Sequence, residues 1–248
     1  RVLAQTARRL GCRSVAFTYN DPVIFMEYAI DTAIECHKLG IKTVAVTAGY
    51  INPEPRNEFF RHMDAANVDL KAFTDAFYWK ICGGHLEPVL DTLRYLHHDT
   101  ATWLEITTLL IPGENDSDDE LAQLVTWVAG NLGTEVPVHF TAFHPDWKMM
   151  DHPSTPPATL TRARRIAMSH GLRHVYTGNV RDPVGANTYC HACGTTLIGR
   201  DGYTITAWHL DANGACQRCG TRCAGVFEAA HGAWGERRVP VRIHDRSL

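Results

Sequence analysis

The sequence alternates between short runs rich in β-branched and aromatic residues and longer stretches with the apolar spacing of amphipathic helices. The short runs predict six strands, at 14–19, 43–47, 67–70, 103–111, 136–143 and 174–178. The longer stretches predict helices at 2–10, 22–39, 55–65, 86–97, 117–131 and 155–171, with a further short one at 75–82. Such alternation favours parallel strands joined by right-handed crossovers. The predicted fold class is therefore α/β, as a doubly wound sheet or as a full or partial (β/α) barrel.

Each predicted strand ends in residues that its interior would not tolerate. The endings are Asn20-Asp21, Thr47-Ala48-Gly49-Tyr50, Asp69-Leu70-Lys71, Pro112-Gly113-Glu114-Asn115, His144-Pro145-Asp146 and Gly178-Asn179. The carboxyl ends of parallel strands open on one face, where ligands bind. We therefore expect these residues to line one binding face. Each ending also has a structural interpretation, since Asp21-Pro22 can simply cap the next helix and 47–50 can be a tight turn.

Two Cys-x2-Cys-Gly turns lie near the end of the chain. Cys190 and Cys193 form the first and Cys216 and Cys219 form the second, and residues 196–210 between them have the pattern of a β-hairpin. Four such thiolates suit tetrahedral zinc, which would stabilise a module too small to fold alone. The pattern predicts a zinc ribbon at 187–223, with rubredoxin-like iron as the alternative.

Cys223 allows another interpretation of the second turn. Cys216, Cys219 and Cys223 are spaced Cys-x2-Cys-x3-Cys, which can hold three irons of an iron–sulfur cube. That arrangement would leave Cys190 and Cys193 without a metal. Residues 224–248 are rich in glycine and then in arginine, and they predict an irregular tail.

The overall charge gives no support to some classes of partner. With a formal net charge of -3, the chain has no electrostatic reason to bind nucleic acid or an acidic membrane tightly, and charged residues or histidines interrupt every apolar stretch. The remaining cysteines, Cys12, Cys36 and Cys82, are scattered, which is unlike a disulfide framework. We expect a cytoplasmic protein. The sequence lacks an initiator Met and has helical spacing from its first residues, so we also expect residues upstream.

The strand endings, taken in order, resemble a known family. "TYNDP", "VTAGY", "NVDLKAF", "LEITTLLIPGENDS", "HFTAFHPDWKM" and "YTGNV", followed by "NTYCHACG" and "CQRCG", are similar to the radical S-adenosylmethionine enzymes of the AmmeMemoRadiSam system. These enzymes in turn resemble pyruvate formate-lyase activating enzymes. The resemblance covers about residues 1–223 and implies a partial (β/α) barrel of the radical SAM type over residues 1–182.

The same resemblance implies the cofactors and the reaction. The cofactors would be S-adenosyl-L-methionine and a [4Fe-4S] cluster with one open iron, supplied with electrons by a donor partner. The implied reaction is reductive cleavage of S-adenosylmethionine to a 5'-deoxyadenosyl radical, which abstracts hydrogen from a substrate. That substrate is unknown, and a protein glycine is one possibility. No residue of the chain is assigned a catalytic role.

The resemblance also implies which residues bind S-adenosylmethionine. The strand-end residues match positions that contact the methionine part, the ribose or the adenine in relatives. They are Asn20 and Asp21 (methionine amino group), Thr47 and Gly49 (close backbone approach), Asp69 (ribose), Lys71 (methionine carboxylate), His144 (ribose or adenine) and Asn179 (adenine side). Tyr50 or Phe143 is a looser candidate for stacking on adenine.

The sequence departs from the family at the cluster. The family holds its cluster with a Cys-x3-Cys-x2-Cys loop, and that spacing does not occur in these 248 residues. We therefore expect the cluster ligands upstream of this sequence and expect the chain alone to be inactive. Ala48 also replaces an Asn that many relatives carry.

Two other functions remain open from the sequence. One is a non-catalytic barrel whose ribbon, with Arg218 and Arg222, binds protein or nucleic acid. The other is a different α/β enzyme that uses His144 and Asp69 as acid and base.

Overall fold

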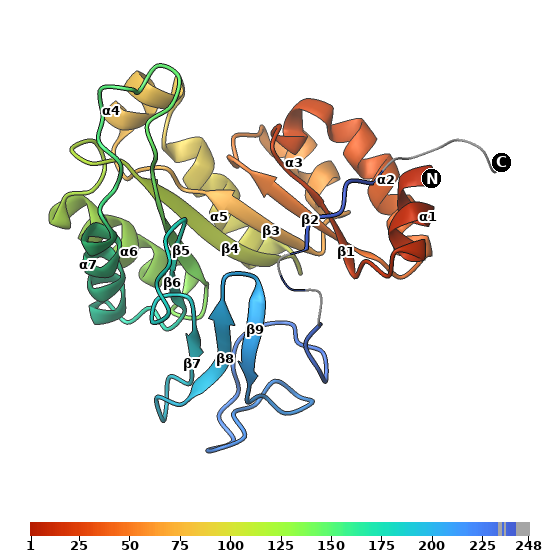
Figure 1. Cartoon of the computed structure of the whole chain (residues 1–248). Helices are drawn as coiled ribbons and strands as arrows, with labels where there is room; N and C mark the ends of the chain where they lie inside the picture. The colour runs from red at the N-terminus through yellow and green to blue at the C-terminus, as the bar shows by residue number, and fades with distance from the viewer. Residues whose placement is uncertain (233–234, 236, 242–248) are drawn as a thin grey trace. The chain divides into compact units, whose positions relative to one another are not determined.

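The chain folds around a parallel sheet of six strands. The structure is a computed structural model that describes residues 1–232, 235 and 237–241. The sheet order is β1-β2-β3-β4-β5-β6, so strands neighbouring in sequence are neighbours in the sheet (Figure 1). The pairings β1–β2, β2–β3, β4–β5 and β5–β6 are parallel, which confirms the predicted α/β class. The strands are β1 (Ser14–Phe17), β2 (Lys42–Thr47), β3 (Ala65–Asp69), β4 (Trp103–Leu110), β5 (Val138–Ala142) and β6 (Val175–Gly178).

Helices fill each connection between consecutive strands, as parallel pairing requires. These connecting helices are the 3₁₀ turn η1 (Pro22–Phe25), α2 (Met26–Lys38), α3 (Pro53–Phe60), α4 (Asp75–Phe77), the π-helical turn η2 (Tyr78–Cys82), α5 (Glu87–Asp99), α6 (Asp118–Leu132) and α7 (Pro157–Ser169). Helix α1 (Val2–Arg9) precedes β1. The helix predicted at 55–65 ends at Phe60, because Ala65 already pairs with β2 as the first residue of β3. The helix predicted at 22–39 begins as the separate turn η1.

The chain divides into two compact units. The first comprises Arg1–Leu70 and His85–Glu105 with the described part of Arg238–Leu248, and the second comprises Lys71–Gly84 and the described part of Ile106–Arg237. Strand β4 crosses the boundary between them. The domain limits predicted from the sequence, 1–182, 187–223 and 224–248, stay predictions.

In the first unit, small residues allow helices to approach the sheet closely. Helix α2 packs against β2, and Ala29, Ala33 and Ala45 are fully buried there. Helix α1 packs against β1 and α2, where Cys36 is buried in a small apolar cluster. Because burial disfavours the charged thiolate, it raises the pKa of Cys36.

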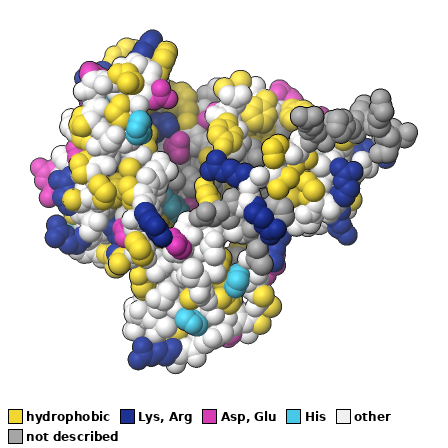
Figure 2. Space-filling model, in the orientation of Figure 1, with side chains coloured by type: hydrophobic (Ala, Val, Ile, Leu, Met, Phe, Trp, Pro, Cys, Tyr) yellow, Lys and Arg dark blue, Asp and Glu magenta, His cyan; other side chains and the backbone are white. Residues whose placement is uncertain are grey.

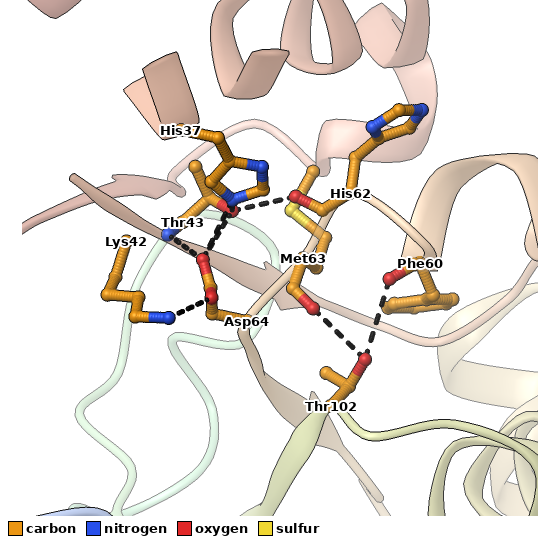
Figure 3. Close-up of polar contacts among 8 residues, drawn as sticks. All are labelled: His37, Lys42, Thr43, Phe60, His62, Met63, Asp64 and Thr102. Carbon is orange, nitrogen blue, oxygen red and sulfur yellow. Dashed lines mark hydrogen bonds and ion pairs between the residues drawn. The ribbon is translucent and has the colours of Figure 1, made fainter. Parts of the chain in front are cut away.

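A carboxylate joins the amino ends of β2 and β3 in the same unit (Figure 3). Asp64 Oδ2 accepts hydrogen bonds from the Thr43 N–H (2.8 Å) and the Thr43 hydroxyl (3.2 Å) and lies 2.9 Å from His37 Nε2. Its Oδ1 accepts from Lys42 Nζ at 2.7 Å. Burial by itself would raise the pKa of Asp64, but the hydrogen bonds from Lys42, Thr43 and His37 outweigh it and lower that pKa. This end of the sheet is opposite to the predicted binding face, so we assign the network to stability.

In the second unit, the sheet has one covered and one open face. Along β4, Ile106, Thr108 and Leu110 are buried whereas Leu109 is 37 % exposed, the alternation expected of a strand covered on one side. Helix α7 packs against β5, β6 and α6 (Figure 1). The buried side chains of this layer include Phe140 and Leu160.

A separate three-stranded antiparallel sheet follows β6. Its order is β7-β8-β9, with β7 (Thr188–Tyr189), β8 (Thr196–Asp201) and β9 (Thr204–Trp208), and β8 and β9 form the predicted hairpin. Arg200 of β8 lies 5.6 Å from the ring centre of Tyr176 on β6 and donates to the Thr188 hydroxyl, which is 2.9 Å from Tyr176 Oη. These contacts join the small sheet to β6.

The predicted tail, residues 224–248, has no regular structure where it is described. Residues 224–232 form neither helix nor strand, and residues 233–234, 236 and 242–248 of the predicted tail lie outside the described residues. Lysine and arginine side chains are scattered among acidic and hydrophobic ones on the face drawn in Figure 2. In the described part of the chain, no helix combines the length and the apolar character needed to cross a bilayer.

Candidate functional site

Asp21 joins the carboxyl ends of β1 and β2. Its Oδ1 accepts hydrogen bonds from the Val23 N–H (3.0 Å) and the Thr47 hydroxyl (2.9 Å), and its Oδ2 accepts from the Ala48 N–H (2.8 Å). The first bond caps η1, so the capping interpretation of Asp21-Pro22 is correct. The other two bonds make the same carboxylate part of the strand-end surface. Asn20, beside it, is exposed.

The turn after β2 requires glycine for two reasons. Gly49 has φ of +67°, which disfavours any side chain, and a Cβ there would lie 2.7 Å from Val68 Cγ1. Its N–H donates to the buried Thr47 hydroxyl at 3.1 Å. The backbone at this strand end is therefore fixed by the Thr47 side chain and by the lack of a side chain at Gly49. Tyr50, which follows, is 46 % exposed.

The strand ends of β5 and β6 are also joined. Asn179 follows β6 with φ of +59°, and its Nδ2 donates to the Ala142 carbonyl at the end of β5 at 3.1 Å. His144 lies two residues beyond Ala142 and is exposed, with its Nδ1 3.0 Å from the carbonyl oxygen of the next residue, Pro145. Phe143 is buried, so its ring could stack on adenine only after the structure rearranged.

The predicted binding residues thus form groups within the two units. Asp21, Thr47 and Gly49 lie together in the first unit, and His144 and Asn179 belong to neighbouring strand ends in the second. Asp69 is the half-buried last residue of β3, and Lys71, also half-buried, lies two residues beyond it.

The four predicted metal ligands lie close together in the second unit. The Sγ atoms of Cys190 and Cys219 are 3.6 Å apart and those of Cys193 and Cys216 are 3.8 Å apart, and all four lie within 4.8 Å of one another. Four sulfurs at about 2.3 Å from one tetrahedral ion are about 3.8 Å apart. The spacing therefore fits a single ion, whereas thiolates on separate irons of a cube would lie farther apart.

The two cysteine turns have the same backbone structure. Gly194 N–H donates to the Cys190 carbonyl at 2.9 Å and Gly220 N–H to the Cys216 carbonyl at 2.8 Å, with φ of +70° and +75° at the two glycines. A Cβ at either glycine would meet nothing within 4 Å, so glycine is needed for its conformation rather than for space.

Two threonines that the sequence analysis did not single out contact the sulfurs. Thr195 Oγ1 lies 3.4 Å from Cys193 Sγ, and Thr221 Oγ1 lies 3.4 Å from Cys219 Sγ. Hydrogen bonding from Thr195 lowers the pKa of Cys193 to about 6, and that from Thr221 lowers the pKa of Cys219. The repeated Cys-Gly-Thr in both turns is the sequence signal for this pair.

Burial has the opposite effect on two other cysteines of the same region. It raises the pKa of Cys190 to about 11 and also raises that of Cys223. Cys223 is packed in the small core with Leu197 and Leu210, outside the group of four sulfurs.

The described cysteines do not fit the cluster that the resemblance implies. Cys36 is fully buried among apolar residues of the first unit, whereas Cys12 is exposed. Among the residues that the structure describes, the grouping of side chains suited to a metal is the set of Cys190, Cys193, Cys216 and Cys219. Four thiolates on one tetrahedral ion leave no open coordination position for a ligand.

Comparison with protein families identifies the kind of chain. The model of the radical SAM superfamily matches residues 1–125, just over half of the 248 residues. The chain belongs to the radical SAM superfamily. Membership implies S-adenosylmethionine and an iron–sulfur cluster as cofactors of the family, and it agrees with the resemblance found in the strand endings.

Individual relatives of this radical SAM chain extend over more of it. An uncharacterized protein of Methanocaldococcus jannaschii is 39 % identical over 221 residues, which are 89 % of this chain and 65 % of that protein. The 4-hydroxyphenylacetate decarboxylase activating enzyme of Clostridioides difficile is 22 % identical over 176 residues, 67 % of this chain and 55 % of that enzyme. The chain therefore spans less than two thirds of the length of these curated relatives.

A solved structure shows the same fold. A domain of pyruvate-formate lyase-activating enzyme from Bacteroides vulgatus has a TM-score of 0.58 to this radical SAM chain at 19 % identity, covering 66 % of this chain and 98 % of that one. The open six-stranded parallel sheet is thus of the radical SAM type.

Proposed function

We propose that this chain forms the S-adenosylmethionine-binding part of a radical SAM enzyme of the AmmeMemoRadiSam kind. The observation that carries the proposal is the carboxylate of Asp21, held at a strand end by the Thr47 hydroxyl and the Ala48 N–H. A carboxylate has about four acceptor sites, and three hydrogen bonds already fix its orientation. One site remains for an ammonium group such as that of methionine.

The other proposed contacts follow from the same matching of charge. The Lys71 ammonium suits the methionine carboxylate, because such charge-assisted bonds are the stronger ones in proteins. The further ligand contacts in the proposal are Asn20, Gly49, Asp69, His144 and Asn179.

Bound beside a reduced [4Fe-4S] cluster, S-adenosylmethionine is the source of a 5'-deoxyadenosyl radical for hydrogen abstraction. The cysteines of this chain do not fit that cluster, so we assign no step to it. We propose that the 248 residues by themselves do not cleave S-adenosylmethionine. Reconstitution with iron, sulfide and a reductant, followed by an assay for 5'-deoxyadenosine, tests this, and turnover would contradict it.

The proposed substrate of the whole enzyme is a protein. Relatives are named activating enzymes of 4-hydroxyphenylacetate decarboxylase and of choline trimethylamine-lyase, and an enzyme that activates another enzyme acts on a protein. An electron donor would be the second partner. The eight cysteines are free thiols in the structure, which is compatible with the proposed cytoplasmic location.

We further propose zinc for the four-cysteine site, with a structural role. Metal analysis of the purified chain distinguishes zinc from iron, and iron bound by four thiolates would also absorb visible light.

Titration with S-adenosylmethionine tests the binding proposal. Lys71→Ala should weaken binding by on the order of 1.5 to 3 kcal/mol, because a charge-assisted hydrogen bond is lost. Lys38→Ala is the matched control, since Lys38 is exposed at the end of α2 and pairs with Glu35. Equal affinity of the Lys71 variant and the unaltered chain would refute the assigned role of Lys71.

A further inference from the structure

Two buried side chains hold the backbone of Lys71. The Lys71 N–H donates to Tyr78 Oη at 3.0 Å, and the Lys71 carbonyl accepts from Asn115 Nδ2 at 2.6 Å. Tyr78 is 3 % exposed and Asn115 is 2 % exposed. Lys71, Tyr78 and Asn115 all belong to the second compact unit. The peptide groups on both sides of the Lys71 Cα are thus fixed by side chains that have little freedom of their own.

Asn115 uses its whole amide group in this arrangement. Its Nδ2 also donates to the Leu109 carbonyl at 2.9 Å, and its Oδ1 accepts from the Ile111 N–H at 2.7 Å. A buried amide is costly unless its hydrogen bonds are made, and here both donors and the acceptor are used. Asn115 therefore connects the segment after β3 to the end of β4 at a defined distance.

Other contacts already hold the segment that follows Lys71. The Phe73 N–H donates to Glu120 Oε1 at 2.7 Å, and the Thr74 hydroxyl caps α4 by accepting from the Phe77 N–H at 3.3 Å. The two bonds to Lys71 are additional to these. They fix the residue that begins the segment, whose side chain carries a positive charge.

We propose that Asn115 and Tyr78 are positioning residues that fix the backbone of Lys71 and thereby direct its ammonium toward the carboxylate of the bound amino acid part of S-adenosylmethionine. A lysine side chain has four rotatable bonds, so the position of its charge depends strongly on the position of its Cα. This inference rests on the proposed function, because it assumes that Lys71 contacts the ligand.

A double-mutant cycle on the 248-residue chain tests the inference, with S-adenosylmethionine as the probe. The variants are Asn115→Ala, Tyr78→Phe and Lys71→Ala, and each of the first two combined with Lys71→Ala. Tyr78→Phe removes the hydroxyl and keeps the ring, so it disturbs the packing least. Asn131→Ala is the matched control, because the Asn131 amide donates to the Trp127 carbonyl on α6. Thermal unfolding of every variant is measured alongside.

If Asn115 and Tyr78 act through Lys71, each single variant weakens binding at least about threefold when Lys71 is present and less than about twofold when it is Ala. A purely structural role would instead give the same factor in both backgrounds, which would overturn the inference. Unchanged binding in Asn115→Ala and Tyr78→Phe would overturn it too. If the unaltered chain does not bind, or if Lys71→Ala binds equally well, the proposed function itself fails, and the two failures are thus distinguishable.

Discussion

Substitution of Asp64 by Asn should destabilise the first unit by about 1.5 kcal/mol. Asn keeps the size of the side chain and can still accept from the Thr43 N–H, but the acceptor loses its charge. Hydrogen bonds to charged groups contribute roughly 1 kcal/mol more than neutral ones. The Lys42 partner is 68 % exposed, so its loss adds only about 0.5 kcal/mol. For a chain of this size, the sum corresponds to a decrease in Tm of about 3 to 6 °C.

The assay is thermal and urea unfolding of Asp64→Asn beside Asp31→Asn, which removes the same charge from an exposed position on α2. The pKa of Asp64 is lowered in the folded state, so its contribution is present above the unfolded pKa of about 3.9 and is lost as pH falls through the folded value. The difference between the two variants should therefore shrink toward pH 3. A difference below about 0.5 kcal/mol at neutral pH, or one that does not change with pH, would refute the reasoning.

Three further predictions concern other parts of the chain. Gly49→Ala should lower the free energy of unfolding in urea by about 2 kcal/mol more than Gly40→Ala does, because both glycines have positive φ but only Gly49 faces a close atom, Val68 Cγ1. Equal losses would show that the contact with Val68 does not matter. Metal analysis should find about one ion per chain. The Cys12→Ser variant should keep this ion and the Cys216→Ser variant should lose it. An ion retained in Cys216→Ser would contradict the four-cysteine site. His152 Nε2 lies 3.0 Å from Glu114 Oε1, and this contact, together with the bond to Asp151, raises the pKa of His152. Its stabilisation of the loop between β5 and α7 is complete below the unfolded pKa of about 6.5 and is lost as pH rises through the folded pKa. At about pH 6, trypsin should therefore cleave after Lys148 faster in Glu114→Gln than in the unaltered chain, and at about pH 9 the two should be cleaved at the same rate. An NMR titration in which Glu114→Gln leaves the His152 pKa unchanged would contradict this.

Local patterns were sufficient to predict the elements of the fold. The alternation of strand and helix patterns predicted every strand of the parallel sheet to within a few residues, because apolar periodicity and chain breakers are local properties. The end of α3 was predicted too late. Residues 61–65 have a pattern compatible with a helix, but pairing of Ala65 with Val44 of β2 decides their conformation, and this pairing is not visible locally.

The candidate sites were predictable only in part. The spacing of Cys190, Cys193, Cys216 and Cys219 predicted that their sulfurs meet, because two short turns of fixed geometry need only one hairpin between them. The roles of Tyr78 and Asn115 were not predictable, since a tyrosine in a short helix and an asparagine in a loop have no spacing that connects them to Lys71.

The sequence by itself determined the class of fold, the order of the strand-end residues, the pair of cysteine turns and the family. These depend on residue type and on separation along the chain. The tertiary structure alone decided which carboxylate is held by Thr47 and Ala48, that Cys223 is outside the group of four sulfurs, and that the backbone of Lys71 is held from both sides. The bonds of Asp21 to Thr47 and Ala48 and that of Asn115 to Lys71 join residues distant in sequence, and such contacts are set by the packing of whole elements rather than by local preference.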